Sequence, residues 1–247
     1  MLADKPWKLD AVARLILGLI TTYCFGLLLA GLVQHFAFGS AQGQSDSWQI
    51  VIAIPFIQIS ALVWISFFLR QHDLGWVEAF GLKTFKPAAA VARGLLVGAL
   101  FLPAAWALGW ISQNAMESVG LPTEEQAAVH ALQDPSLTMP AKVVFGVVII
   151  ILAPAVEEPL FRGIIYPAIK QQGYPRLALW GSAAIFAAMH FNGLTLVPLF
   201  FFALVLVYLY ESSRNLLAPM AAHALFNAAN FFFLLFGDQI SQRFHLP

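Results

Sequence analysis

The sequence predicts an all-α fold: a polytopic bundle of about seven transmembrane helices, or eight if the count around 190–196 is off by one. Of its 247 residues, 60% are hydrophobic and only 11% are charged, and the mean hydropathy is +0.77. A soluble domain usually carries about 25% charged residues. So little charge cannot cover a globule of this size in water, but it suits a bundle whose surface is mostly lipid.

The apolar runs have the length of membrane-crossing helices, since crossing the hydrocarbon takes about 20 residues. The candidate spans are 11–33, 49–69, 94–116, 142–170, 177–192, 195–211 and 215–236. The connections between them are short, and we find no internal repeat. We therefore expect residues 1–247 to form a single integral membrane domain.

Lysine and arginine set the expected orientation. They occur in alternate connections, namely the N-terminal segment, 70–93, 170–176 and 211–215, and are absent from 34–48 and 117–141. The sequence thus predicts a cytoplasmic N-terminus, seven crossings and an outside C-terminus. The net charge of zero gives no reason to expect nucleic acid as a partner.

A few polar residues fall inside the predicted spans, away from their ends. Ionisable groups at membrane depth are functional candidates by default. These residues are Glu157, Glu158, Arg162, His190 and His223, with Asn227 as a neutral companion. All of them lie between residues 142 and 236, so we expect one shared site rather than scattered polar positions.

Spacing predicts how these groups meet. Glu157 and His190 are equally far along the chain from the turn at 173–174, so in an antiparallel helix pair both would lie about 25 Å from it. Glu158 and Arg162 are four residues apart, the spacing of a helical ion pair. Glu157 then points about 100° away from Glu158 around the helix.

Two further positions bear on the same region. His223 and Asn227 are also four apart and are expected on one helix face. Pro159 follows the glutamate pair and removes a backbone donor, so we expect it to kink or restart the helix.

These residue types suit hydrolysis of a peptide bond by an activated water. A buried carboxylate beside an imidazole can hold a water and accept its proton. A second imidazole together with an amide can donate hydrogen bonds to a developing oxyanion. Neither a metal nor a cofactor is required, although zinc held by Glu157, His190 and His223 also fits the ligand chemistry. The H-E-x-x-H pattern of zinc proteases does not occur.

Other interpretations of the same residues stay open. The Glu157–His190 couple suits a proton-coupled transporter, although transporters commonly have paired halves. A non-catalytic membrane protein, such as one conferring bacteriocin immunity, could keep the polar cluster for stability. Taken alone, Asn227 and Asn230 suit hydrogen bonding between helices, and Gly94 and Gly98 suit close helix packing. We take the phenylalanine-rich stretches 199–202 and 231–233 as lipid-facing filler.

The motifs together resemble those of a known family. Glu157-Glu158-x-x-x-Arg162, then Phe186-x-x-x-His190, then His223-x-x-x-Asn227 is similar to the signature of the CAAX protease and bacteriocin-processing family. That family includes the Ras-converting prenyl-protein endopeptidases and bacterial abortive-infection-type proteins. The resemblance covers residues 142–236, which would be the catalytic core.

The resemblance implies a glutamate-dependent, metal-independent intramembrane endopeptidase. Glu157 and His190 would activate the water, and His223 with Asn227 would form the oxyanion hole. Glu158, Arg162 and Phe186 would support them.

The resemblance also implies partners and a location. The substrate would be a membrane-associated peptide or protein, lipidated in the relatives that cut prenylated C-a-a-X tails, and the bilayer itself would be the other partner. The cavity would open toward the cytoplasmic side. The compact size and short loops favour a prokaryotic plasma membrane.

Overall fold

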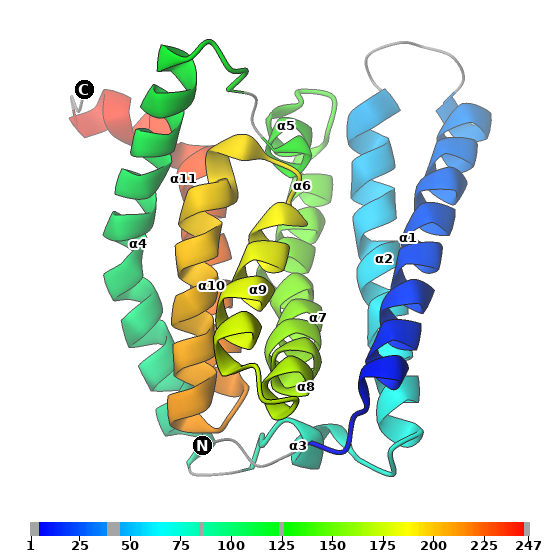
Figure 1. The fold of residues 1–247 in the computed structure, drawn as a ribbon. Coiled ribbons are helices and arrows are strands. Elements are labelled where there is room, and N and C mark those ends of the chain that lie inside the picture. Colours follow the sequence, from blue (N-terminus) through cyan, green and yellow to red (C-terminus); the bar gives the residue numbers. More distant parts are fainter. Residues whose placement is uncertain (1–4, 39–44, 84–85, 124–125, 245–247) are drawn as a thin grey trace.

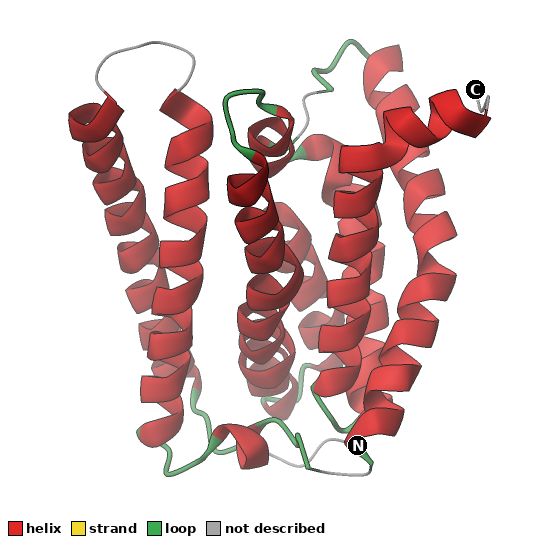
Figure 2. Cartoon of the chain, turned by 180° about the vertical axis from the view of Figure 1, so that it is seen from behind, coloured by secondary structure: helices red, strands yellow, loops and turns green. Residues whose placement is uncertain are grey.

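The computed structural model describes residues 5–38, 45–83, 86–123 and 126–244. Within these ranges the chain forms helices joined by turns and contains no strand. Most of the helices run along one common direction, and the same arrangement is seen from behind in Figure 2. The predicted all-α bundle is confirmed.

The first two helices form a hairpin at one side of the bundle (Figure 1). They are α1 (Leu9–Phe38) and α2 (Ser45–Arg70). Gly18 lets the Trp64 ring approach α1, and the Trp64 indole N–H donates to the Thr22 hydroxyl at 2.9 Å. A polar pair inside an apolar hairpin fixes how the two helices face each other.

The next long helix stands at the opposite side of the bundle from this hairpin (Figure 1). The short α3 (Trp76–Ala79) precedes α4 (Pro87–Ser118), and α5 (Ala127–Gln133) follows it. Gly94 and Gly98 of α4 are buried against Ala218 and Ala222. The predicted role of this glycine pair in close helix packing is confirmed.

Residues 139–171 form one long helix with changes of pitch. It consists of α6 (Met139–Val147), a π-helical segment η1 (Val148–Leu152), α7 (Ala153–Glu158), a second π-helical segment η2 (Pro159–Ile165) and α8 (Tyr166–Gln171). Both glutamates of the first motif therefore lie in the short α-helical stretch between two wide turns.

The last three helices are α9 (Pro175–Ala188), α10 (Gly193–Ser213) and α11 (Leu217–Phe244). Of the described helices, six are long and apolar enough to cross a membrane. The remaining predicted span, 177–192, corresponds to α9, which has only 14 residues. At a rise of about 1.5 Å per residue, α9 is shorter than a hydrocarbon core of about 30 Å. Six of the seven predicted spans are thus long enough to cross the hydrocarbon, and the one predicted at 177–192 is short.

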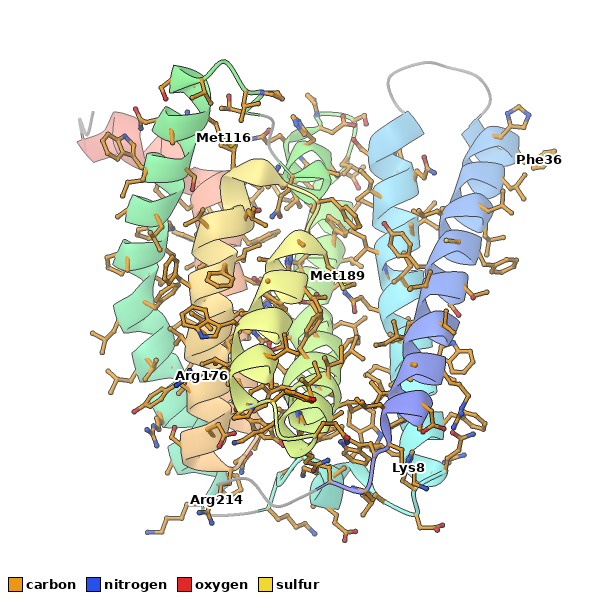
Figure 3. The ribbon with its side chains drawn as sticks, viewed as in Figure 1. Lys8, Phe36, Met116, Arg176, Met189 and Arg214 are labelled. Atoms are coloured by element: carbon orange, nitrogen blue, oxygen red, sulfur yellow. The ribbon has the colours of Figure 1, made fainter. Side chains whose placement is uncertain are left out.

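The charged ends of the bundle agree with the alternation of lysine and arginine in the sequence. Lys8 and Arg214 lie toward one end, and Phe36 and Met116 lie toward the other (Figure 3). The described chain begins at the first end and finishes at the second (Figure 1). This arrangement fits an odd number of passes in which α9 is one short pass. The assignment of the basic end to the cytoplasm stays a prediction.

Candidate active site

The helix that carries the glutamates is shaped by its prolines. Pro154 and Pro159 have no N–H to donate, and each stands at or beside a π-helical segment. The sequence predicts a kink or a restart of the helix at Pro159, and in the structure the helix changes there from α-helical to π-helical turns. It continues through the wide turns of η2, which bury Arg162 in the bundle.

Glu158 forms the centre of a buried ionic cluster. Its Oε1 accepts from Arg162 Nη1 at 3.0 Å and from His223 Nδ1 at 2.7 Å. The Glu158 side chain is 0% exposed and that of Arg162 is 2% exposed. The ion pair predicted from the four-residue spacing is present, and the structure adds His223 from α11 as its second partner.

Arg162 is held on several sides. One amino group lies 3.4 Å from the carbonyl oxygen of Ala203 in α10. Its guanidinium carbon lies 4.3 Å from the centre of the Phe186 ring, a cation–π contact. Phe186 also contacts both histidine rings, with centroids 5.0 Å from His190 and 5.7 Å from His223. The aromatic residue of the second motif thus joins the arginine to the two imidazoles.

Glu157 faces a different side of the helix from Glu158, as predicted. Its side chain is 23% exposed, and its Oε2 lies 3.9 Å from His223 Nε2. The His223 ring therefore sits between the two carboxylates, with Nδ1 toward Glu158 and Nε2 toward Glu157. Of the two glutamates, Glu157 is the one that solvent or substrate can reach.

His190 lies just beyond the end of α9 and is partly exposed. Its Nδ1 is 2.8 Å from the carbonyl oxygen of Phe186. Because a carbonyl can only accept, we assign the hydrogen to Nδ1, which leaves the Nε2 lone pair of a neutral ring available as a base. No direct hydrogen bond joins His190 to Glu157 within the described residues, so their joint action on a water stays a prediction.

Asn227 connects α11 to the glutamate helix. Its Nδ2 donates to the carbonyl oxygen of Ile149 at 2.9 Å. A primary amide carries two N–H groups, so this bond uses one of them. Three residues further on, Asn230 accepts from the Trp106 indole at 3.2 Å. Both asparagines thus form the interhelical hydrogen bonds that their residue type suggests.

Phe202 is a component of the site that sequence reasoning missed. We took it as lipid-facing filler, and this interpretation is wrong, because its side chain is fully buried. Its ring meets His223 nearly at right angles, with centroids 5.7 Å apart. It also stacks on Phe226 at 4.3 Å and on Phe101 at 5.4 Å. The neighbouring Phe201, by contrast, is exposed, as are Phe232 and Phe233.

We expect Phe202→Leu to lower kcat strongly while the Tm falls only moderately. Losing the ring removes its contact with the His223 ring, and because leucine keeps part of the side chain, the change should cost less than the roughly 3–5 kcal/mol of a Phe→Ala truncation. Peptide cleavage and thermal unfolding of the purified protein measure both effects. Phe101→Leu is the matched control, since it removes a ring from the same stack without contacting His223. Equal kcat values for the two variants would contradict a role for Phe202 at His223.

The cluster does not form a ready metal site. Within the described residues, no group of three or more His, Cys, Asp or Glu side chains is arranged to hold a metal ion. The zinc arrangement considered for Glu157, His190 and His223 would thus need side chains to move. That the protein works without a cofactor stays a prediction.

Comparison with known proteins supports the same region. Residues 139–229 match the family model described as "Type II CAAX prenyl endopeptidase Rce1-like". The resemblance to CAAX proteases is confirmed. The matched residues contain all the side chains of the ionic cluster, together with His190 and Asn227. With its six long apolar helices, the chain is an integral membrane protein.

A curated relative and the solved structures add less. The uncharacterized protein YpbD of Bacillus subtilis (strain 168) is 37% identical over 76 residues, which are 29% of this chain and 36% of the relative. The match thus spans only about a third of that relative's length. No solved structure matches significantly.

Proposed function

We propose that the protein is an intramembrane endopeptidase that hydrolyses peptide bonds of membrane-associated substrates. The observation that carries the proposal is the connected set Arg162–Glu158–His223–Glu157 among membrane-spanning helices, of which all but Glu157 are buried. It lies inside the segment that is similar to CAAX prenyl endopeptidases. A charged cluster that served stability alone would not need its second carboxylate to be partly exposed.

The charges divide into a fixed pair and a working pair. Arg162 and Glu158 neutralise each other in full burial, where an unpaired charge would be very costly. Glu157 is then left to take a proton from a reacting group, and His223 is left to donate a hydrogen bond to one. When His223 carries hydrogens on both nitrogens, its ring can hold Glu158 and donate to a second oxygen at the same time.

The chemistry follows from these positions. A water held between Glu157 and His190 gives its proton to Glu157, and its oxygen attacks the peptide carbonyl carbon. The carbonyl electrons move onto oxygen, where His223 Nε2–H and the second N–H of Asn227 donate hydrogen bonds. The tetrahedral intermediate collapses with cleavage of the C–N bond, and Glu157 returns the proton to the departing amine.

The substrate proposed is a peptide or protein segment that reaches the membrane, with a lipidated C-a-a-X-type tail as the leading case. The similarity to CAAX prenyl endopeptidases supports this choice. We place the enzyme in a prokaryotic plasma membrane with its opening on the cytoplasmic side. The basic end of the bundle supports the cytoplasmic orientation, and the compact size and short loops of the chain support the choice of membrane.

Cleavage by Glu157→Gln tests the proposal. The amide keeps the size of the side chain but cannot accept the water proton, so we expect at least about a 10²-fold loss of kcat. Thermal stability should be unchanged, because Glu157 is not part of the buried pair. The measurement uses purified protein in detergent with prenylated and unprenylated peptides, and Glu117→Gln on the exposed end of α4 serves as the control.

Two outcomes would overturn parts of the proposal. Parental activity in Glu157→Gln would remove the assignment of the base. Activity that is lost on chelation and restored by zinc would replace the metal-independent mechanism with a metal-dependent one.

A further inference from the structure

The long helix of residues 139–171, which carries Glu157 and Glu158, has a gap in its main-chain hydrogen bonding between Ile149 and Pro154. In the wide turn η1, the N–H of Ala153 donates to the carbonyl of Val148, five residues earlier. The next residue in this register is Pro154, whose partner would be the carbonyl of Ile149. Proline has no N–H. The Ile149 carbonyl therefore receives neither the bond from Ala153 that an α-helix would provide nor one from Pro154.

Asn227 fills this gap. Its Nδ2 donates to the Ile149 carbonyl oxygen at 2.9 Å, across the interface between α11 and η1. In a membrane interior there is no bulk water to satisfy a freed carbonyl, so a side-chain donor is strongly favoured there. Asn227 stands one helical turn beyond His223, which contacts both glutamates. The bond thus ties the asparagine to the same helix that holds the carboxylates.

We propose that Pro154 is a positioning residue for Asn227. By lacking an N–H, Pro154 keeps the Ile149 carbonyl free as the acceptor that fixes one N–H of the Asn227 amide. The other N–H is thereby aimed toward the site. This inference rests on the proposed function only in assigning that second N–H to the oxyanion.

Substituting Pro154→Ala tests the idea against ordinary helix propensity. Proline is the least favourable residue in a helix interior and alanine the most favourable, so a purely structural role predicts a protein that is at least as stable and fully active. Our proposal predicts instead that the new N–H, or that of Ala153 in a regular α-helix, takes the Ile149 carbonyl and releases Asn227. Removing one oxyanion donor typically costs about 10²–10³-fold in kcat, and we expect a loss of at least about tenfold with KM unchanged.

The control is Pro103→Ala, which also replaces a proline inside a membrane helix, α4, but at a position whose side chain is exposed. This variant should keep the parental kcat. In the Asn227→Ala background, Pro154→Ala should cause no further loss of kcat, because its effect passes through the missing amide.

A second measurement does not depend on activity. Asn227→Ala should lower the Tm, because it leaves the Ile149 carbonyl without a donor. Adding Pro154→Ala to that variant supplies a main-chain N–H and should recover most of the lost Tm. The gain in Tm from Pro154→Ala should therefore be larger in the Asn227→Ala background than in the parent, whereas Pro103→Ala should change the Tm equally in both backgrounds.

The outcomes separate this inference from the proposed function. Parental kcat in Pro154→Ala, or a double variant with no recovery of Tm, would overturn the role of Pro154. Full activity in Glu157→Gln would overturn the proposed function, while the Tm recovery would still show whether Pro154 leaves the carbonyl to Asn227.

Discussion

Arg162→Ala is expected to lose both folded protein and activity. Among the residues that the structure describes, the guanidinium is the only full positive charge against the Glu158 carboxylate, apart from His223 when its ring is protonated. Glu158 is fully buried, and its Oε2 already has no hydrogen-bond donor among the described residues. Removing one partner of a buried ion pair costs about 3–5 kcal/mol, because the other charge is left uncompensated. Native proteins are stable by only about 5–15 kcal/mol in total.

Thermal unfolding in detergent and the yield of monodisperse protein measure this loss. The chain provides a matched control in the pair Arg14–Asp10, which has the same four-residue spacing and a distance of 2.8 Å, but with side chains 69% and 62% exposed. Exposed pairs contribute at most about 1 kcal/mol, so Arg14→Ala should unfold close to the parental temperature. Equal effects of the two substitutions would mean that burial does not govern the Arg162 pair.

A double variant separates stability from catalysis. Replacing both members of a buried ion pair by apolar residues is often neutral or stabilising, so Arg162→Leu with Glu158→Leu should recover much of the lost stability. It should stay inactive, because His223 Nδ1 loses the Glu158 oxygen that it holds at 2.7 Å. A stable double variant with parental activity would show that the pair has no part in positioning His223.

The parts of this structure that follow from the sequence are those set by regular spacing. Apolar length predicts the six long spans, and a four-residue step predicts the Glu158–Arg162 pair. The contact of His223 with Glu158 joins residues 65 positions apart. It depends on the register between α7 and α11, which no spacing within one helix determines.

Phe202 and α9 show why other features were missed. The buried face of α10 includes Leu199, Phe202 and Leu206, at helical intervals. In a soluble protein, polar residues on the opposite face would reveal such a stripe. Here the opposite face is lipid-facing and equally apolar, so the sequence does not distinguish the buried face from the exposed one. The shortness of α9 was missed because Met189 and Phe191 prolong the apolar character past Ala188, its last helical residue.

Gly94→Ala is expected to disrupt the close packing between α4 and α11. A Cβ at position 94 would stand 2.1 Å from the carbonyl oxygen of Ala218 and 2.9 Å from its carbonyl carbon. These are backbone atoms of α11 and cannot rotate away, so the two helices would have to separate. Overpacking costs about 1–3 kcal/mol and occasionally more, and we expect this site to reach or exceed the upper end of that range.

The same substitution on the same helix gives the control. Apart from the adjoining residues of α4 itself, no described residue has a heavy atom within 4 Å of a Cβ built at Gly109. Alanine is better than glycine in a helix interior by about 0.8–1.0 kcal/mol, so Gly109→Ala should be neutral or raise the Tm, whereas Gly94→Ala should lower it. The sign of the change thus depends on the neighbour and not on the residue type, and a Tm increase in both variants would contradict the packing described for Gly94.

The close packing between α4 and α11 should affect activity as well as stability. Ala218 lies five residues before His223 on α11, and Ala222, which Gly98 contacts, lies directly before it. A helix pushed away at Ala218 shifts His223 relative to the glutamates on α7, where the Nδ1–Oε1 distance is 2.7 Å. Misplacement of reacting groups by about 1 Å can cost about 10²-fold in rate. We therefore expect the folded fraction of Gly94→Ala to cleave peptide far more slowly than Gly109→Ala when equal amounts of folded protein are compared.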